Sequence, residues 1–153
     1  MNPLNISNNR VANATKANIW NTGVVGVYRL LGVAYGINLN SLNLDNPIAL
    51  NLVPEAGAGT AYYKVGAITV NNASTSLTTA QLAVYDAASG GGNNLAAAQA
   101  LSALTAATKD LSLTLAAGAT GTALTSNTLY ARNTTAQGAA ATGDVYVWGW
   151  VYP

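Results

Sequence analysis

The stretch that decides the fold is Asp144-Val145-Tyr146-Val147-Trp148-Gly149-Trp150-Val151-Tyr152, near the C-terminus. Successive side chains of a β-strand point to opposite faces of its sheet. One face of this segment therefore carries four large aromatic side chains: Tyr146, Trp148, Trp150 and Tyr152. The other carries Val145, Val147, Gly149 and Val151. We expect one face to belong to a core, and the other to meet a sheet, a subunit or a ligand.

The same two-residue alternation recurs upstream and predicts about eight short strands. In residues 48–53, Ile48, Leu50 and Leu52 alternate with Ala49, Asn51 and Val53, and Pro54 is expected to end the strand. Further strands are expected at residues 82–85, 110–115, 128–133 and 144–152. In residues 62–72 we expect Tyr63, Val65, Ala67 and Thr69 on one face, and Tyr62, Lys64, Ile68 and Val70 on the other.

Glycines and turn residues separate these strands. Residues 24–39 read as β-structure, with Gly26, Gly32 and Gly36 marking bulges or close approaches of the backbone. Residues 38–47 are turn-like and residues 55–60 form a Gly/Ala loop. Residues 89–94 (Ser-Gly-Gly-Gly-Asn-Asn) lack the Lys-Ser/Thr of a phosphate-binding loop. They predict a hairpin turn.

Residues 95–104 (Leu-Ala-Ala-Ala-Gln-Ala-Leu-Ser-Ala-Leu) are ambiguous. Their intrinsic propensity favours a helix, whereas all of their neighbours predict strands. We interpret this segment as strand or irregular structure.

Together these patterns predict an all-β protein, an antiparallel β-sandwich or jelly-roll-like fold. We expect a single domain over residues 24–153, preceded by an extended N-terminal arm at residues 1–23. The arm is rich in Asn and poor in large apolar groups, with Trp20 as its one anchor. It could be a disordered terminus or a segment that orders on a partner.

The composition argues against catalysis. The chain has no His and no Cys, which removes the commonest general base, the thiol nucleophile and the usual zinc and copper ligands. The five acids are Asp45, Glu55, Asp86, Asp110 and Asp144, and none lies within six residues of another. Lone acids in a β-protein are usually turn or cap residues. We therefore expect no enzyme, no catalytic residues, no metal and no cofactor.

The distribution of charged and apolar residues argues against nucleic acid and a membrane as partners. The six cations are scattered singly and the net charge is +1, so no basic stripe for nucleic acid is visible. The longest apolar stretch, residues 24–39, is interrupted by Arg29 and three glycines and predicts no membrane span. Because interface cores exclude charge, such a surface suits contact with other subunits.

Residues 1–20 lack the features of a signal peptide, and the absence of Cys fits synthesis in a reducing compartment. Asn-x-Ser/Thr triplets at Asn5, Asn13, Asn72 and Asn133 are therefore read as chance matches rather than glycan acceptors.

Residues 65–152 resemble a family of small tailed-bacteriophage virion proteins. The resemblance is carried by Val65-Gly66-Ala67-Ile68-Thr69-Val70, Leu82-Ala83-Val84-Tyr85 with its Gly-Gly-Gly turn, Ala100-Leu101-Ser102-Ala103-Leu104-Thr105, Thr128-Leu129-Tyr130-Ala131-Arg132 and Gly143-Asp144-Val145-Tyr146-Val147-Trp148-Gly149. It implies a β-sandwich structural protein of the virion that decorates or cements the capsid. It implies no catalytic residues, and residues 1–64 lie outside it.

The expected function is a capsid decoration (cement) protein, made in the host cytoplasm and bound to the capsid surface of the virion. Its expected partners are the major capsid protein and further copies of itself, most simply in a homotrimer. The interface candidates are Trp20, Tyr146, Trp148, Trp150 and Tyr152. Two alternatives remain open: a head or tail fibre module whose aromatic residues bind a host surface glycan, and a bacterial adhesin or surface-layer domain.

Overall fold

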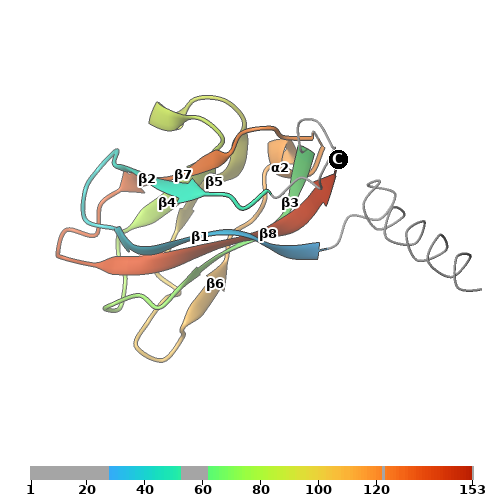
Figure 1. Ribbon diagram of the computed structural model, residues 1–153. Coiled ribbons are helices and arrows are strands. Elements are labelled where there is room, and N and C mark those ends of the chain that lie inside the picture. The colour runs from blue at the N-terminus through green and yellow to red at the C-terminus, as the bar shows by residue number, and fades with distance from the viewer. Residues whose placement is uncertain (1–27, 53–61, 122, 153) are drawn as a thin grey trace, which may run out of the picture.

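The computed structural model describes residues 28–52, 62–121 and 123–152 and shows two four-stranded sheets packed face to face (Figure 1). The first sheet has the order β1 (Tyr28–Asn38), β8 (Thr142–Tyr152), β3 (Tyr62–Asn71), β6 (Asp110–Ser112). The second has the order β2 (Asp45–Ala49), β7 (Thr128–Thr135), β4 (Gln81–Tyr85), β5 (Asn94–Ala100). Because neighbouring strands are antiparallel in both sheets, the expected all-β sandwich is confirmed.

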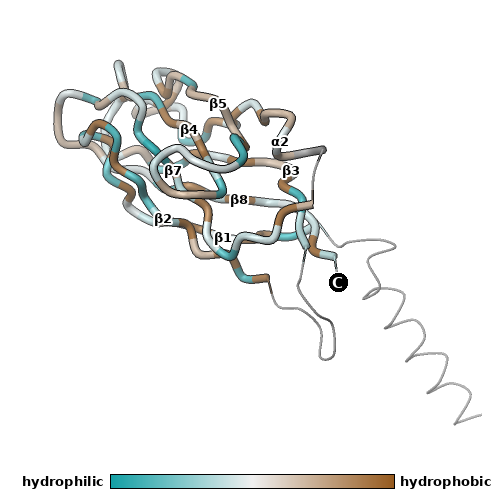
Figure 2. Tube along the Cα trace, turned by 90° about the horizontal axis from the view of Figure 1, so that it is seen from above, coloured by the Kyte–Doolittle hydropathy of each residue, from teal (hydrophilic) through white to brown (hydrophobic). Residues whose placement is uncertain are grey.

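The core lies between the two sheets. On β8, Val145 and Val147 are fully buried, so the valine side of the C-terminal strand is the one that faces the core. The first sheet adds Tyr63 and Val65, among other residues, and the second adds side chains such as Leu129. Figure 2 shows hydrophobic and hydrophilic residues interspersed along the chain of the sandwich.

Short segments close the sandwich along both of its sides. Residues 49–52 leave the second sheet and join β1, where Leu50 bridges Gly32 and the Asn51 N–H donates to the Leu31 carbonyl at 2.7 Å. Gly32 is required there, because a Cβ would lie 2.6 Å from the Ala49 carbonyl oxygen. On the other side, residues 113–116 cross from β3 to β5.

The Gln99 side chain completes this second junction. Its amide nitrogen donates to the Thr114 carbonyl at 3.0 Å, and its amide oxygen accepts from the Thr114 N–H at 3.0 Å. One side chain therefore makes the pair of hydrogen bonds that a neighbouring strand would make.

The expected faces of β3 are wrong beyond Gly66. The register against β8 shifts between Val65 and Ala67, which is a β-bulge at Gly66. A bulge adds one residue and reverses the alternation after it. Ile68 and Val70 consequently join Tyr63 and Val65 in the core, whereas Ala67 and Thr69 lie on the outer side with Lys64. Uninterrupted alternation had placed Ile68 and Val70 with Lys64.

The boundaries of β2 also differ from the expectation. The strand begins at Asp45, so residues 45–47 are paired rather than turn-like, and it ends at Ala49 rather than at residue 53. Pro47 is tolerated because β2 is the edge strand of its sheet. Leu50, instead of continuing the strand, takes part in the junction with β1.

The ambiguous segment at residues 95–104 contributes β5 and then a turn, which confirms the interpretation as strand or irregular structure. Of residues 110–115, only Asp110–Ser112 form a strand. A 3₁₀ turn at Ala88–Gly90 and a short helix α2 at Ala117–Gly121 complete the described fold.

Other expectations fall outside the described residues. These are the N-terminal arm at residues 1–23 with Trp20, the start of the expected β-structure at residues 24–27, and the loop at residues 55–60. Of the two Asn-x-Ser/Thr sites in the described chain, Asn72 is exposed and Asn133 is 1% exposed. A side chain as buried as Asn133 is closed to modification in the folded protein.

Candidate functional site

The outer side of the first sheet carries a band of large apolar side chains, which we call the aromatic face. Its members are Tyr28, Leu30 and Tyr35 of β1, Tyr62 of β3, and Tyr146, Trp148, Trp150 and Tyr152 of β8. The strand register builds the band, because Tyr28 lies opposite Trp150 and Leu30 opposite Trp148. On the other side of β8, Tyr62 lies opposite Tyr152.

The rings at the end where β1 begins form one packed group. The centroids of Tyr28 and Trp150 are 4.8 Å apart with the rings edge to face, and Tyr28 stacks on Trp148 at 6.4 Å. Both distances are within the range of attractive aromatic pairs. The three rings therefore support one another on the surface of the sheet.

This group of rings packs against the backbone at Gly66. A Cβ on Gly66 would lie 2.6 Å from both the Trp150 indole and the Tyr28 ring, so the two rings lie directly against the backbone of β3. The bulge at this glycine thus has two effects: it restores Ile68 and Val70 to the core, and it allows the indole to pack across the neighbouring strand.

The opposite end of the face has a more polar margin. Tyr35 and Tyr146 meet edge to face at 6.1 Å. Desolvation raises the pKa of Tyr146, and the neighbouring Tyr35 and Asp144 raise it further, so its hydroxyl stays protonated. The Asp144 carboxylate accepts hydrogen bonds from the Gly36 N–H at 2.8 Å and the Asn72 amide at 2.9 Å. The carboxylate at this margin is thus already paired with donors, whereas a cation, Lys64, lies on the outer side of β3 opposite Trp150.

The aromatic face is large enough to be a contact surface. Tyr28 is 47% exposed, Tyr35 73%, Tyr62 43% and Leu30 37%. With about 150–250 Å² for a whole aromatic side chain, these residues leave on the order of 400 Å² open to solvent. A patch of roughly 300–600 Å² is the largest that a typical monomer exposes, and it usually marks an interaction site.

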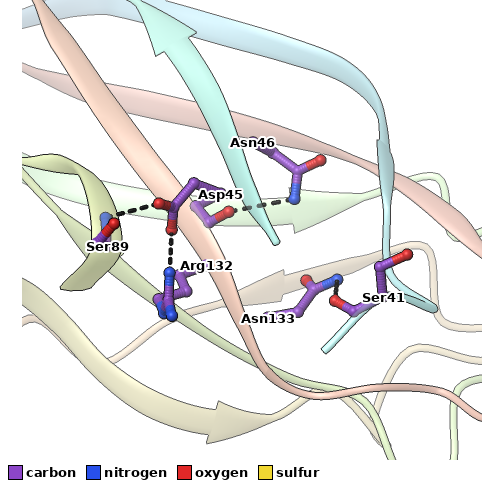
Figure 3. A network of polar contacts seen from close by, with 7 residues as sticks. Ser41, Asp45, Asn46, Ser89, Arg132 and Asn133 are labelled. Carbon is purple, nitrogen blue, oxygen red and sulfur yellow. Dashed lines mark hydrogen bonds and ion pairs between the residues drawn. The ribbon is translucent and has the colours of Figure 1, made fainter. Parts of the chain in front are cut away.

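A second exposed apolar group lies on the loop between β1 and β2. In this loop, residues 39–44, which we call the leucine loop, Leu42 is 61% exposed and Leu44 is 37% exposed. The buried Asn133 holds the loop: its amide donates to the Ser41 carbonyl at 3.0 Å (Figure 3) and to the Asn38 carbonyl at 2.5 Å. The Asn43 N–H in turn donates to the Asn133 carbonyl at 2.8 Å.

The outer side of the second sheet is organised around an ion pair (Figure 3). The Asp45 carboxylate on β2 accepts hydrogen bonds from the Arg132 guanidinium on β7 at 2.8 Å and from the Ser89 N–H at 2.6 Å. Partial burial alone would raise the pKa of Asp45, but these two donors hold it below its ordinary value. The 3₁₀ turn is thereby fixed over the sheet.

The structure brings together four of the five interface candidates from the sequence, Tyr146, Trp148, Trp150 and Tyr152, while Trp20 is outside the described residues. Sequence reasoning missed Tyr28, Leu30, Tyr35 and Tyr62, and it missed the leucine loop. Tyr28 and Leu30 follow the two-residue period, but register shifts after Leu30 and after Ala34 interrupt it. The doublet Tyr62-Tyr63 did not reveal which ring faces outward.

Among residues 28–52, 62–121 and 123–152, no three acidic side chains gather as a metal site would require, and no helix is long and apolar enough to cross a membrane. Comparison with known family models, curated proteins and solved structures finds no match.

Proposed function

We propose that this protein is a structural protein of a bacteriophage virion, which decorates the capsid and reinforces contacts between major capsid subunits. The proposal rests on one observation above all. A closed β-sandwich with very few charges presents a broad aromatic face whose rings are packed on the sheet but remain partly exposed. Such a surface suits burial against protein.

The character of the aromatic face supports this assignment over catalysis. Interface cores are enriched in Tyr and Trp and depleted of charge, and the anchors of tight interfaces are most often Trp, Tyr and Arg. Here Trp148 and Trp150 form the centre of the face, and the one carboxylate at its margin, Asp144, is already hydrogen-bonded. The resemblance of residues 65–152 to small virion proteins points to the same class of function.

The direct test is to mix the purified protein with capsids that lack it and to measure binding and shell stability. We expect saturation at hundreds of copies per particle and a rise in the temperature at which the shells open. Saturation at a handful of copies, or binding that leaves shell stability unchanged, would contradict a cementing role. Trp148→Ala and Trp150→Ala, checked for folding, should bind less than the native protein.

Removal of residues 1–20 tests whether the N-terminal arm contributes to this binding. The segment has little apolar content for a core, and we expect the truncated protein to fold but to decorate shells poorly, because an arm that orders on a neighbour adds contact area. If truncated and full-length proteins decorate shells equally, the arm is not part of the contact.

A second candidate function is a fibre module that binds a host surface glycan. The observation in its favour is the margin of the aromatic face, where Tyr35 is 73% exposed and meets Tyr146 edge to face at 6.1 Å. An exposed ring of this kind can stack on a sugar. In that case Tyr35→Ala would abolish adsorption to host cells without changing shell stability, whereas a cement protein would show no adsorption defect.

A further inference from the structure

We propose that the leucine loop of one copy docks on the aromatic face of a second copy, in a head-to-tail contact that closes into a ring. This inference rests on the proposed role of the aromatic face as a protein-contact surface, and it names the partner of that face. The two surfaces are the two places where the described chain exposes large apolar side chains.

The leucine loop is held in one conformation before any partner binds. Besides the bonds from Asn133, the Asn40 N–H donates to the Asn38 side chain at 2.8 Å, and the Asn38 amide donates to the Ser41 hydroxyl at 3.2 Å. Asn43 has a left-handed backbone with φ of 59°, a conformation that Asn tolerates better than other non-glycine residues, and its N–H is bonded to the Asn133 carbonyl. A loop fixed in this way loses little entropy on binding.

The leucine loop differs from the other loops of the described chain in the exposure of its leucines. Leu42 is largely exposed and Leu44 partly exposed, and residues 39–44 contain no Lys, Arg, Asp or Glu. The loops at residues 72–80, 101–109 and 136–141 are also uncharged apart from Lys109, yet their leucines, Leu77, Leu101 and Leu104, are buried. The leucine loop is therefore built as an apolar projection.

The aromatic face has the matching character. It is broad and largely apolar, with Lys64 beside Trp150. Its open area of on the order of 400 Å² is about half of the roughly 800 Å² that each partner contributes to a standard interface. The loop and the adjoining strand ends of a neighbour can supply the remainder.

Within one copy the leucine loop does not reach the packed ring group of the aromatic face, although Tyr35, at the other end of this face, lies close to the loop along β1. The packed ring group of Tyr28, Trp148 and Trp150 lies where β1 begins, whereas the leucine loop follows the other end of this 11-residue strand (Figure 1). At about 3.3 Å per residue, the strand separates them by roughly 30 Å. A contact between different patches of identical chains is heterologous, and it either closes into a ring or grows into a filament. The limited size of a decoration unit favours the ring.

Two variants test the pairing. Leu42→Asp places a charge on the leucine loop, and Leu30→Asp places one on the aromatic face beside Trp148. We expect the full-length native protein to sediment as a closed oligomer, each variant alone to be monomeric with an unchanged fold, and an equimolar mixture to form a one-to-one dimer. The dimer arises because the intact loop of one variant still meets the intact face of the other.

Other results overturn the inference. One is a native protein that stays monomeric at its highest soluble concentration. Another is a Leu42→Asp variant that assembles like the native protein. A third is an equimolar mixture that stays monomeric although each variant alone is monomeric and folded. Ala97→Asp, at an exposed position on β5, is the matched control and should assemble like the native chain. If Leu30→Asp does not fold, Tyr62→Asp at the start of β3 replaces it.

The outcomes for this inference and for the proposed function are separable. A protein that forms the ring but does not bind shells contradicts only the capsid role. A monomer that decorates and stabilises shells contradicts only the head-to-tail contact.

Discussion

The two outer faces of the sandwich solve the problem of an exposed sheet surface in opposite ways. On the second sheet, the Asp45–Arg132 pair and the 3₁₀ turn that it holds cover the strands with groups from the chain itself. On the first sheet, the chain places Trp148, Trp150 and their neighbours on the surface and covers them with nothing in the described structure. A face completed from within needs no partner, and an aromatic face left partly open does.

The largest effect should come from the indoles. Trp148→Ala or Trp150→Ala should reduce the free energy of unfolding by about 2 kcal/mol, below the roughly 3–5 kcal/mol of a fully buried Trp because both side chains are only partly buried. For a chain of this size, that shift lowers Tm by about 4–8 °C. Both variants should also disrupt the oligomer, which calorimetry and size-exclusion chromatography would measure.

Tyr130→Ala is the matched control for this comparison. Tyr130 lies on the outer side of the second sheet, opposite Pro47 and Tyr85, and is also half-exposed. It should lower Tm by a similar or smaller amount and leave the oligomer intact. If Tyr130→Ala dissociates the protein and the Trp variants do not, the two faces have the opposite roles. Unchanged melting and assembly in both Trp variants would favour the glycan-binding fibre.

A smaller effect is expected from the ion pair. Arg132→Met should destabilise the fold by about 1–2 kcal/mol, since it leaves the partly buried Asp45 carboxylate with only the Ser89 N–H as a donor. The loop at residues 86–93 should then be cut faster in limited proteolysis. Asp110→Asn, at an exposed acid on β6, should change neither stability nor cleavage. Equal cleavage of the native and Arg132→Met proteins would mean that the pair does not hold the turn.

The pH dependence of the stability should also reflect the hydrogen-bonded Asp45 carboxylate. The folded-state pKa of Asp45 lies below its unfolded value of 3.8, so the carboxylate contributes stability that is present above about pH 4 and is lost as the pH falls through the folded pKa. Denaturant melts between pH 6 and pH 2 should show this loss, and Asp45→Asn should reduce it. An identical acid profile for Asp45→Asn would place the responsible groups elsewhere.

The smallest effect should be that of salt on assembly. The chain has six cations and five acids over 153 residues, and Asp45, Arg132 and Asp144 are occupied within the described fold. The oligomer should therefore persist in moderate sodium chloride and dissociate in mild detergent, which light scattering can follow. Dissociation by salt alone would indicate an interface built on charge rather than on the aromatic face.

The sequence predicted those parts of the fold that depend on local alternation. The division of β8 into a valine side and an aromatic side was correct, although the sequence left open which side faces the core. The segment that contains β5 was interpreted as strand or irregular structure despite its helical propensity. Sequence reasoning failed where a single residue changes the register. The bulge at Gly66 reverses the second half of β3, and nothing within that strand specifies the bulge, because its role appears only when the Trp150 indole lies across it.

The leucine loop could not be predicted from the sequence, for a different reason. Its conformation depends on Asn133, 95 residues after Asn38, and an Asn in a β-rich chain gives no local sign of a buried structural role. Likewise, Pro47 predicts a turn unless it is known that β2 lies at the edge of its sheet. Both features depend on contacts between residues that are far apart in the chain, and such contacts cannot be recognised in a single sequence.

The closure of both sides of the sandwich has a consequence for how copies of this chain behave when crowded. With so few charges, electrostatic repulsion does little to keep molecules apart, and an open sheet edge would invite strand-to-strand aggregation. Residues 49–52 cover part of one side, and residues 113–116 with Gln99 cover part of the other. Association is thereby directed to side-chain surfaces that can bind and release, instead of to backbone addition that would run on without limit.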